Sequence, residues 1–212
     1  MSGSAPGVVV IGNGGHARAC IDAWDAASPW QPVGCTGLDP AEPSEVLYLG
    51  TDAALSSMLA QGHRRVFVAI GGSELRERRL QHAIEMGFTP YTLIAASAQV
   101  ARTATVEGGV AVLRGAIVGA FSQVGAGAII NTGASVDHDC VIGPFTHIAP
   151  GTHVAGTVSI GAHSMLGVGV SVVPGIRIGS HAIVGAGAVV ISDVPDGETV
   201  VGVPARPTKR KA

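Results

Sequence analysis

An aliphatic residue returns at every sixth position from Val100 to Val190, without a missing member. The series is Val100, Val106, Val112, Val118, Val124, Ile130, Val136, Ile142, Ile148, Val154, Ile160, Leu166, Val172, Ile178, Val184 and Val190. This period fits neither the 3.6-residue repeat of an α-helix nor the two-residue alternation of a strand. It matches the hexapeptide repeat of a parallel β-helix, in which three hexads make one coil. Sixteen hexads make a little over five coils, and coils stacked about 4.8 Å apart predict a three-sided prism roughly 25 Å tall.

Small residues support this prediction, because a narrow three-sided coil has little room inside. The residue four places after each aliphatic is usually small, as in Ala116, Ser122, Ala128, Ala134, Cys140, Thr146, Thr152 and Ser164. Glycine often follows the aliphatic directly, where a corner can use its freedom in φ. The prism is therefore expected to occupy residues 97–212.

Residues 7–95 instead alternate apolar runs with segments of helical spacing. Strands are expected at 8–11, 33–36, 66–70 and 91–94, and helices after the first strand, over about 51–61 and from 73 to 86. This alternation predicts a small, parallel, doubly wound sheet over residues 1–96, a Rossmann-like α/β domain.

A glycine-rich turn, Gly12-Asn13-Gly14-Gly15-His16, links the first strand to the first helix. Such a turn can hold a phosphate on backbone amides at the helix N-terminus. It matches the dinucleotide fingerprint only in part, because Ala17 stands at the third glycine position, and a turn that merely packs tightly fits as well. Ligands of parallel sheets bind at the carboxyl ends of the strands, which here carry this turn, Asp39 and the glycines at 71–72.

The composition narrows the class of protein. A net charge of -2 with 13% charged residues argues against a nucleic-acid partner. Apolar runs are broken by Gly, Pro or polar residues well before the roughly 20 residues of a membrane span. Three cysteines without metal spacing are typical of a reducing cytoplasm, where we expect the protein to work.

Histidines of the prism are the candidates for chemistry. His138 lies between Asp137 and Asp139, and one coil of 18 residues later stands Gly156. A histidine beside carboxylates, facing an accessible backbone N–H, could supply a general base, its orienting acid and an oxyanion donor. A solvated corner histidine with two surface aspartates fits the same pattern.

The remaining histidines have structural interpretations. His163 and His181 share one hexad position a coil apart, which predicts that they stack in a column. His147 and His153 fall in consecutive hexads and should lie on neighbouring faces. Three histidines meeting at a subunit interface could bind zinc, but the spacing gives no ligand signature.

Three segments together carry a family resemblance. They are Gly12-Asn13-Gly14-Gly15-His16, the segment from Val136 to Gly143, and Gly202-Val203-Pro204-Ala205. With the hexad repeat, the chain resembles the sugar acetyltransferases of the left-handed β-helix class that carry an N-terminal nucleotide-binding domain. These include the bacillosamine-pathway and perosamine N-acetyltransferases and the sialic acid O-acetyltransferases. The left hand rests on the resemblance, because the usual crossover rule favours the right hand.

The resemblance implies a homotrimer with acetyl-CoA in a groove between subunits, and no metal. By position, His138 resembles the catalytic base, Asp139 its acidic partner and Gly156 the amide that meets the thioester oxygen. Asn131 and His147 match further active-site positions, seven residues before the base and nine after it. The region that binds the nucleotide sugar contains Gly14, Gly15, His16, Asp39, Gly71 and Arg76.

The implied function is acetyl-CoA-dependent acetylation of the C4 amine of a GDP- or UDP-linked 4-amino-4,6-dideoxy sugar, such as perosamine or a bacillosamine precursor. Pro40 follows Asp39 where relatives often have Asp or Lys, which leaves the nucleotide base open. The alternatives are a sialic acid-type O-acetyltransferase, a zinc lyase of the γ carbonic anhydrase type, and a non-catalytic scaffold. The polar residues from Asn131 to Asp139 argue against the scaffold.

Overall fold

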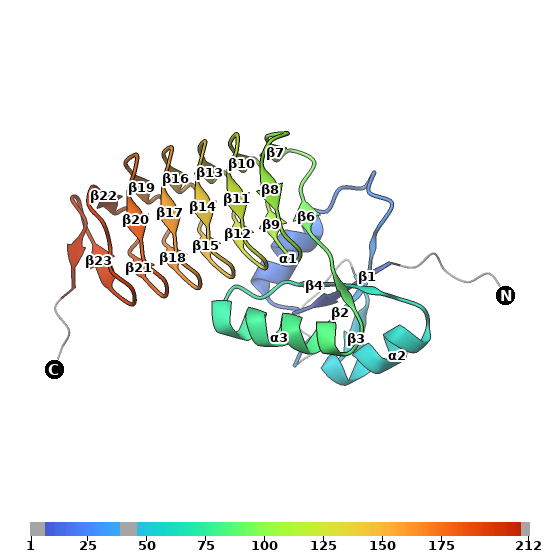
Figure 1. Cartoon of the computed structure of the whole chain (residues 1–212). Helices are drawn as coiled ribbons and strands as arrows, with labels where there is room; N and C mark the ends of the chain where they lie inside the picture. The colour runs from blue at the N-terminus through green and yellow to red at the C-terminus, as the bar shows by residue number, and fades with distance from the viewer. Residues whose placement is uncertain (1–6, 39–45, 209–212) are drawn as a thin grey trace. The chain divides into compact units, whose positions relative to one another are not determined.

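The computed structural model describes residues 7–38 and 46–208. It divides into two compact units, residues 1–96 and 97–212, which are considered separately (Figure 1). The predicted fold class, an α/β domain followed by a parallel β-helix, is confirmed.

The first unit is a parallel sheet in the order β3-β2-β1-β4-β5, which is the strand order of a doubly wound nucleotide-binding half. Its strands are β1 (Val8–Ile11), β2 (Pro32–Thr36), β3 (Tyr48–Gly50), β4 (Arg65–Val68) and β5 (Thr89–Pro90), and β6 (Leu93–Ile94) follows. Its helices are α1 (Gly15–Asp22), the 3-10 turn η1 (Asp52–Ala54), α2 (Leu55–Ala60) and α3 (Ser73–Glu85). The short strands β3 and β5 are additions to the predicted set, and the strand predicted at 91–94 is present only as β6, which does not belong to this sheet.

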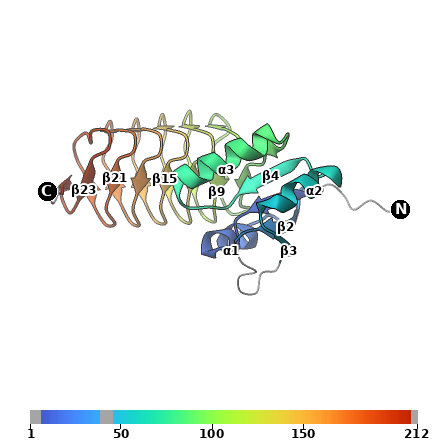
Figure 2. The same ribbon diagram turned by 90° about the horizontal axis from the view of Figure 1, so that it is seen from below.

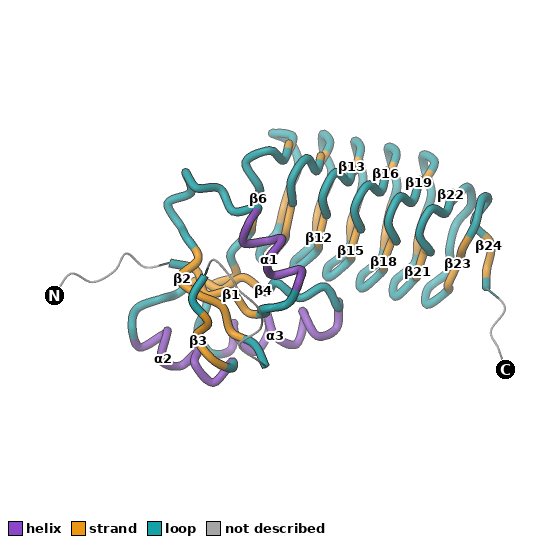
Figure 3. Tube along the Cα trace, turned by 180° about the vertical axis from the view of Figure 1, so that it is seen from behind, coloured by secondary structure: helices purple, strands orange, loops and turns teal. Residues whose placement is uncertain are grey.

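Burial on both faces explains why the central strands are continuous apolar runs. Every residue of β1 is at most 1% exposed. Helix α1 covers one face of the sheet, and α2 and α3 cover the other (Figures 2 and 3). Trp24 closes one side of this core: its ring stacks on Tyr91 and meets the edge of Phe67.

The second unit consists of stacked coils whose strands form three parallel sheets (Figure 1). One sheet contains β7 (Gln99–Val100), β10 (Ile117–Val118), β13 (Ser135–Val136), β16 (His153–Val154), β19 (Ser171–Val172) and β22 (Val189–Val190). The next contains β8 (Thr105–Val106), β11 (Gln123–Val124), β14 (Val141–Ile142), β17 (Ser159–Ile160) and β20 (Arg177–Ile178). The third includes β9 (Ala111–Val112), β12 (Ile129–Ile130), β15 (His147–Ile148), β18 (Met165–Leu166), β21 (Ile183–Val184), β23 (Thr199–Val201) and β24 (Arg206–Pro207).

The period of six therefore sets the architecture as predicted. Each of the strands β7 to β22 ends on one residue of the aliphatic series, and each pairs with the strand 18 residues away, as Val118 pairs with Val136. From Val112 onward every member of the series is at most 4% exposed, so the series forms the core of the prism.

Four of the small interior residues are hydroxyl-bearing, and their polar atoms are satisfied by backbone. Thr146, Thr152 and Ser164 are fully buried, and each donates to a glycine carbonyl 15 residues ahead, at 2.6–2.9 Å. A buried hydroxyl left without a partner would cost about 1–3 kcal/mol. Hydroxyl side chains are therefore tolerated in the interior where they donate a hydrogen bond to the backbone of the next coil.

The predicted histidine column is present at one corner of the prism. The rings of His163 and His181 stack 4.9 Å apart with an interplanar angle of 7°, and Phe145 stacks on His163 at 5.4 Å. His147 and His153 lie in different sheets, again as predicted.

Candidate active site

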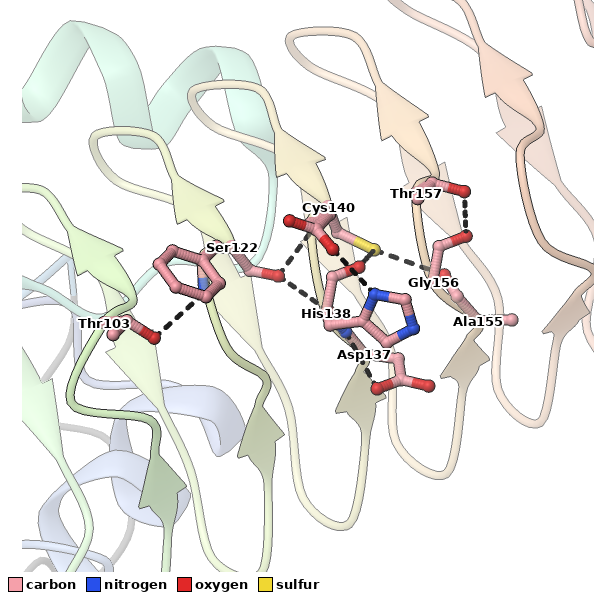
Figure 4. A network of polar contacts seen from close by, with 10 residues as sticks. Thr103, Ser122, Asp137, His138, Cys140, Ala155, Gly156 and Thr157 are labelled. Atoms are coloured by element: carbon pink, nitrogen blue, oxygen red, sulfur yellow. Dashed lines mark hydrogen bonds and ion pairs between the residues drawn. The ribbon is translucent and has the colours of Figure 1, made fainter.

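His138 lies in the turn that carries the chain from β13 to β14. Figure 4 shows its side chain projecting from this turn toward Gly156 in the next coil. The turn is fixed from both neighbouring coils: Asp139 N–H donates to the Ala120 carbonyl, and Thr157 N–H donates to the His138 carbonyl, both at 2.9 Å. His138 thus occupies a rigid backbone position.

The interior of the prism fastens the same turn. Ser122 is fully buried and donates its hydroxyl to the Asp137 carbonyl at 2.6 Å, while it accepts from the Cys140 N–H at 3.0 Å. Both ends of the turn are therefore bound to one side chain of the preceding coil.

Two carboxylates lie beside His138: one binds its imidazole ring and the other binds its backbone N–H. Nδ1 donates to Oδ2 of Asp139 at 2.8 Å, and the His138 backbone N–H donates to Oδ1 of Asp137 at 2.8 Å. The hydrogen bond to Asp139, and then the negative charge of Asp137, raise the pKa of His138 above its ordinary 6.5. Because Nδ1 carries the proton shared with Asp139, Nε2 is the basic nitrogen of the neutral ring.

Asp139 combines this role with a structural one. Its φ of 58° lies in the left-handed region, which Asp and Asn tolerate better than most residues. The same conformation recurs a coil later at Thr157, with φ 61°. The residue that orients the His138 imidazole therefore also allows the corner to turn.

Because Gly156 has no side chain, the His138 imidazole can lie against its backbone. A methyl group on Gly156 would come within 2.6 Å of both Cε1 and Nε2 of His138. Nε2 therefore faces the backbone of Gly156 at close range, which only a residue without a side chain permits.

The pH profile tests the pairing of His138 with Asp139. As a candidate general base, His138 would be active when deprotonated, so the kcat/KM of the reaction should rise with pH through a midpoint set by its raised pKa. Replacing Asp139 with Asn removes the largest cause of that increase, and the rising limb should move to lower pH while the plateau falls. The Asp137→Asn variant is the comparator, with a smaller displacement in the same direction. An unchanged midpoint in Asp139→Asn would contradict the pairing.

Asn131 and His147 form a second pair, at another corner of the same prism. Asn131 Nδ2 lies 3.0 Å from His147 Nε2, and Asn131 Oδ1 accepts from the Thr132 N–H. Asn131 follows β12 and His147 begins β15, whereas His138 follows β13 in a different sheet. The structure of one chain thus brings Asn131 to His147 and His138 to Asp139 and Gly156.

The first unit contains a cleft of about 580 Å³ at the carboxyl ends of its strands. Gly14, Gly15, His16 and Gly71, all predicted to bind the nucleotide sugar, line it. The turn is tight because Gly12 has a φ of 116°, and a side chain there would strike the Ala69 carbonyl. Asp39, also predicted, lies outside the described residues.

Arg76 has a different position from the predicted one. Its side chain is buried, with the residue 1% exposed, and it does not line the cleft. Nη1 donates to the carbonyls of Ile70 and Gly71 at 2.9 and 2.7 Å. These two hydrogen bonds hold the loop after β4 in place from its buried side. Burial, with a contribution from Arg76, lowers the pKa of His16 to about 4, so the His16 ring is neutral at physiological pH.

The cleft also holds two charged residues that sequence reasoning did not assign to it. Oδ1 of Asp52 accepts the Thr36 hydroxyl at 2.6 Å, and Oδ2 pairs with Arg79 Nη1 at 3.1 Å. Asp52 is recognisable in the sequence only as a helix-capping residue, and its role at the cleft depends on β3, which is too short to predict.

Among residues 7–38 and 46–208, no group of three or more His, Cys, Asp or Glu side chains is placed to hold a metal ion. In the same residues, the helices are too short or too polar to cross a bilayer.

Both units of the chain are similar to known proteins. Residues 7–83 match the PglD N-terminal domain model. A perosamine N-acetyltransferase from Caulobacter crescentus, solved as a His-to-Asn variant with CoA and GDP-perosamine, is 41% identical, with a TM-score of 0.93 over 98% of this chain and 99% of that one. The acetyltransferase domain of PglB from Neisseria gonorrhoeae, with acetyl coenzyme A, is 34% identical, with a TM-score of 0.88 over 97% and 100%.

The chain belongs to the family of hexapeptide-repeat acetyltransferases with a PglD-type N-terminal domain. A search of curated proteins found no match. As a member of this family the chain is an acetyltransferase, and the left-handed β-helix expected for its second unit is confirmed. The perosamine N-acetyltransferase is solved with CoA and the PglB acetyltransferase domain with acetyl-CoA, in agreement with the predicted co-substrate.

Proposed function

We propose that this acetyltransferase transfers the acetyl group of acetyl-CoA to the C4 amine of a nucleotide-linked 4-amino-4,6-dideoxyhexose. The observation that carries the proposal is the His138 ring, bound to Asp139 through Nδ1 and facing Gly156 with Nε2. The match to a perosamine N-acetyltransferase makes GDP-perosamine the first acceptor to test. The family resemblance makes a bacillosamine precursor linked to UDP the second.

The chemistry follows from these positions. The amine attacks the thioester carbon and its excess proton passes to Nε2 of His138. The C–S bond then breaks, and the imidazolium returns the proton to the sulfur, so that CoA leaves as the thiol. General-base catalysis of this kind contributes about 10²- to 10⁴-fold in rate. Asp139 holds the imidazole in the required tautomer and stabilises the imidazolium that forms.

The oxyanion that develops on the thioester oxygen needs a donor. The backbone N–H of Gly156 is proposed to supply it, since the thioester must lie beside Nε2 and Nε2 faces this residue. One well-placed donor is worth about 3 kcal/mol in the transition state. No covalent enzyme intermediate is required.

A homotrimer would unite the two pairs of polar residues. Asn131 and His147 lie at another corner from His138, so in this proposal they reach the reaction from a neighbouring copy. Exposed apolar residues on the outer faces, including Ile117, Met165 and Ile183, support burial between copies. The three described cysteines are free, which agrees with a cytoplasmic enzyme.

Thiol release from acetyl-CoA tests the proposal. The panel contains GDP-perosamine, a UDP-linked 4-amino sugar, the matching 4-hydroxy sugars and free sialic acid. Release with a 4-amino sugar and none with its 4-hydroxy counterpart is expected, from a protein that sediments as three copies of the 21.2 kDa chain. Release with sialic acid alone would favour O-acetylation and overturn the proposal.

A further inference from the structure

Asp52 stands at the end of the cleft where the base of a bound nucleotide would lie. The glycine-rich turn follows β1, Thr36 ends β2, and Asp52 follows β3, in a sheet that runs β3-β2-β1. Neighbouring strands are about 4.8 Å apart, so β3 is about 10 Å from β1. A nucleoside diphosphate with its phosphates on Gly14 and Gly15 would extend its ribose past β2 and its base to β3.

The Asp52 carboxylate is fixed on both sides. Thr36 on β2 donates to Oδ1, and Arg79 on α3 pairs with Oδ2, so its plane is set by two different elements. The side chain is 22% exposed, and it borders the cleft together with the apolar side chains of Ile70 and Leu75. Each carboxylate oxygen has two acceptor sites, which leaves acceptor capacity beyond these contacts.

We propose that Asp52 reads the base and selects guanine over uracil, an inference that rests on the proposed nucleotide-sugar substrate. Guanine presents two adjacent donors, N1–H and the 2-amino group, which a carboxylate can accept together. Uracil presents one N–H between two carbonyl oxygens, and those oxygens repel a carboxylate. Arg79 adds a donor beside the carboxylate, where guanine has its O6 acceptor. A site built to accept specific donors strongly rejects a ligand that lacks them.

Binding of free nucleotides measures this selection apart from acetyl transfer. Calorimetry with GDP, IDP and UDP on the full-length protein should give the order GDP, then IDP, then UDP, because IDP lacks only the 2-amino group. In Asp52→Asn the affinity for GDP should fall about tenfold to a hundredfold, the range for losing a hydrogen bond to a charged group. The ratio of the IDP and GDP dissociation constants should then approach one.

Controls separate base reading from a structural role. Asp25→Asn is the matched variant, because Asp25 accepts from the Ala27 N–H outside the cleft, and its affinities should equal those of the wild type. Equal weakening of all three nucleotides in Asp52→Asn would reduce Asp52 to a structural residue and overturn the proposal. So would tighter wild-type binding of UDP than of GDP. Failure of the proposed function would instead appear as absent acetyl transfer, which these binding measurements do not require.

Discussion

Replacing His138 with alanine is expected to lower kcat for acetyl transfer by about 10²- to 10⁴-fold, because the variant has no base to take the amine proton. The backbone of the turn should remain intact, since its hydrogen bonds to Ala120 and Thr157 involve main-chain atoms. The side chain is 55% exposed, so its removal leaves no buried cavity. Thiol release under saturating acetyl-CoA and amino sugar measures the loss, and the melting temperature should hardly change.

His82→Ala is the matched control, because His82 is an exposed residue in the last turn of α3. Its kcat should equal that of the wild type. Raising the pH deprotonates a larger fraction of the acceptor amine and should partly restore the rate of His138→Ala without accelerating His82→Ala to the same extent. Nearly full activity of His138→Ala at neutral pH would remove this residue from the mechanism.

Adding one methyl group at Gly156 is expected to lower kcat by about 10²-fold or more. The new Cβ would lie 2.6 Å from Cε1 and Nε2 of His138, so the imidazole must swing away. That movement breaks the alignment of Nε2 with the thioester and disturbs the bond from Nδ1 to Asp139. Small displacements of a positioned catalytic group cost about this much in rate. Stability should change little, because an exposed side chain can move at low cost.

Gly72→Ala adds the same methyl group where nothing lies within 4 Å, at a backbone φ of -68°, and serves as the control. It should retain the wild-type kcat at saturating amino sugar, because any effect on the cleft beside Gly71 would appear in the KM for the amino sugar. The double variant His138→Ala with Gly156→Ala gives a second test, since two residues that act as a unit are strongly non-additive. If the two losses simply multiplied, Gly156 would act independently of the His138 ring.

The prism could be predicted almost completely from the sequence, because its period is a property of the chain itself. A residue every six positions can fill only one kind of core, and the 18-residue pairing follows from three hexads per coil. The same arithmetic correctly predicted that Gly156 faces His138 and that His163 stacks on His181.

The cleft was less predictable, because its residues come from strand ends whose order no periodicity specifies. From the neighbouring sequence, Asp52 is predicted only to cap a helix. It reaches Thr36 only because β3 pairs with β2. Arg76 was expected at the ligand only from the family resemblance, yet its side chain is buried and binds the carbonyls of the loop after β4. The resemblance of aligned positions cannot reveal on which side of a loop a side chain lies.

The 18-residue register has a consequence for how such enzymes diversify. His138 and Gly156 are separated by one coil, so the distance from the proposed proton acceptor to the proposed oxyanion donor is fixed by the hydrogen-bond spacing of the backbone. The acceptor is proposed to be chosen by side chains in a different compact unit. Substitutions that redirect the enzyme to a new sugar nucleotide therefore need not retune the transfer chemistry, and the two properties can be inherited separately.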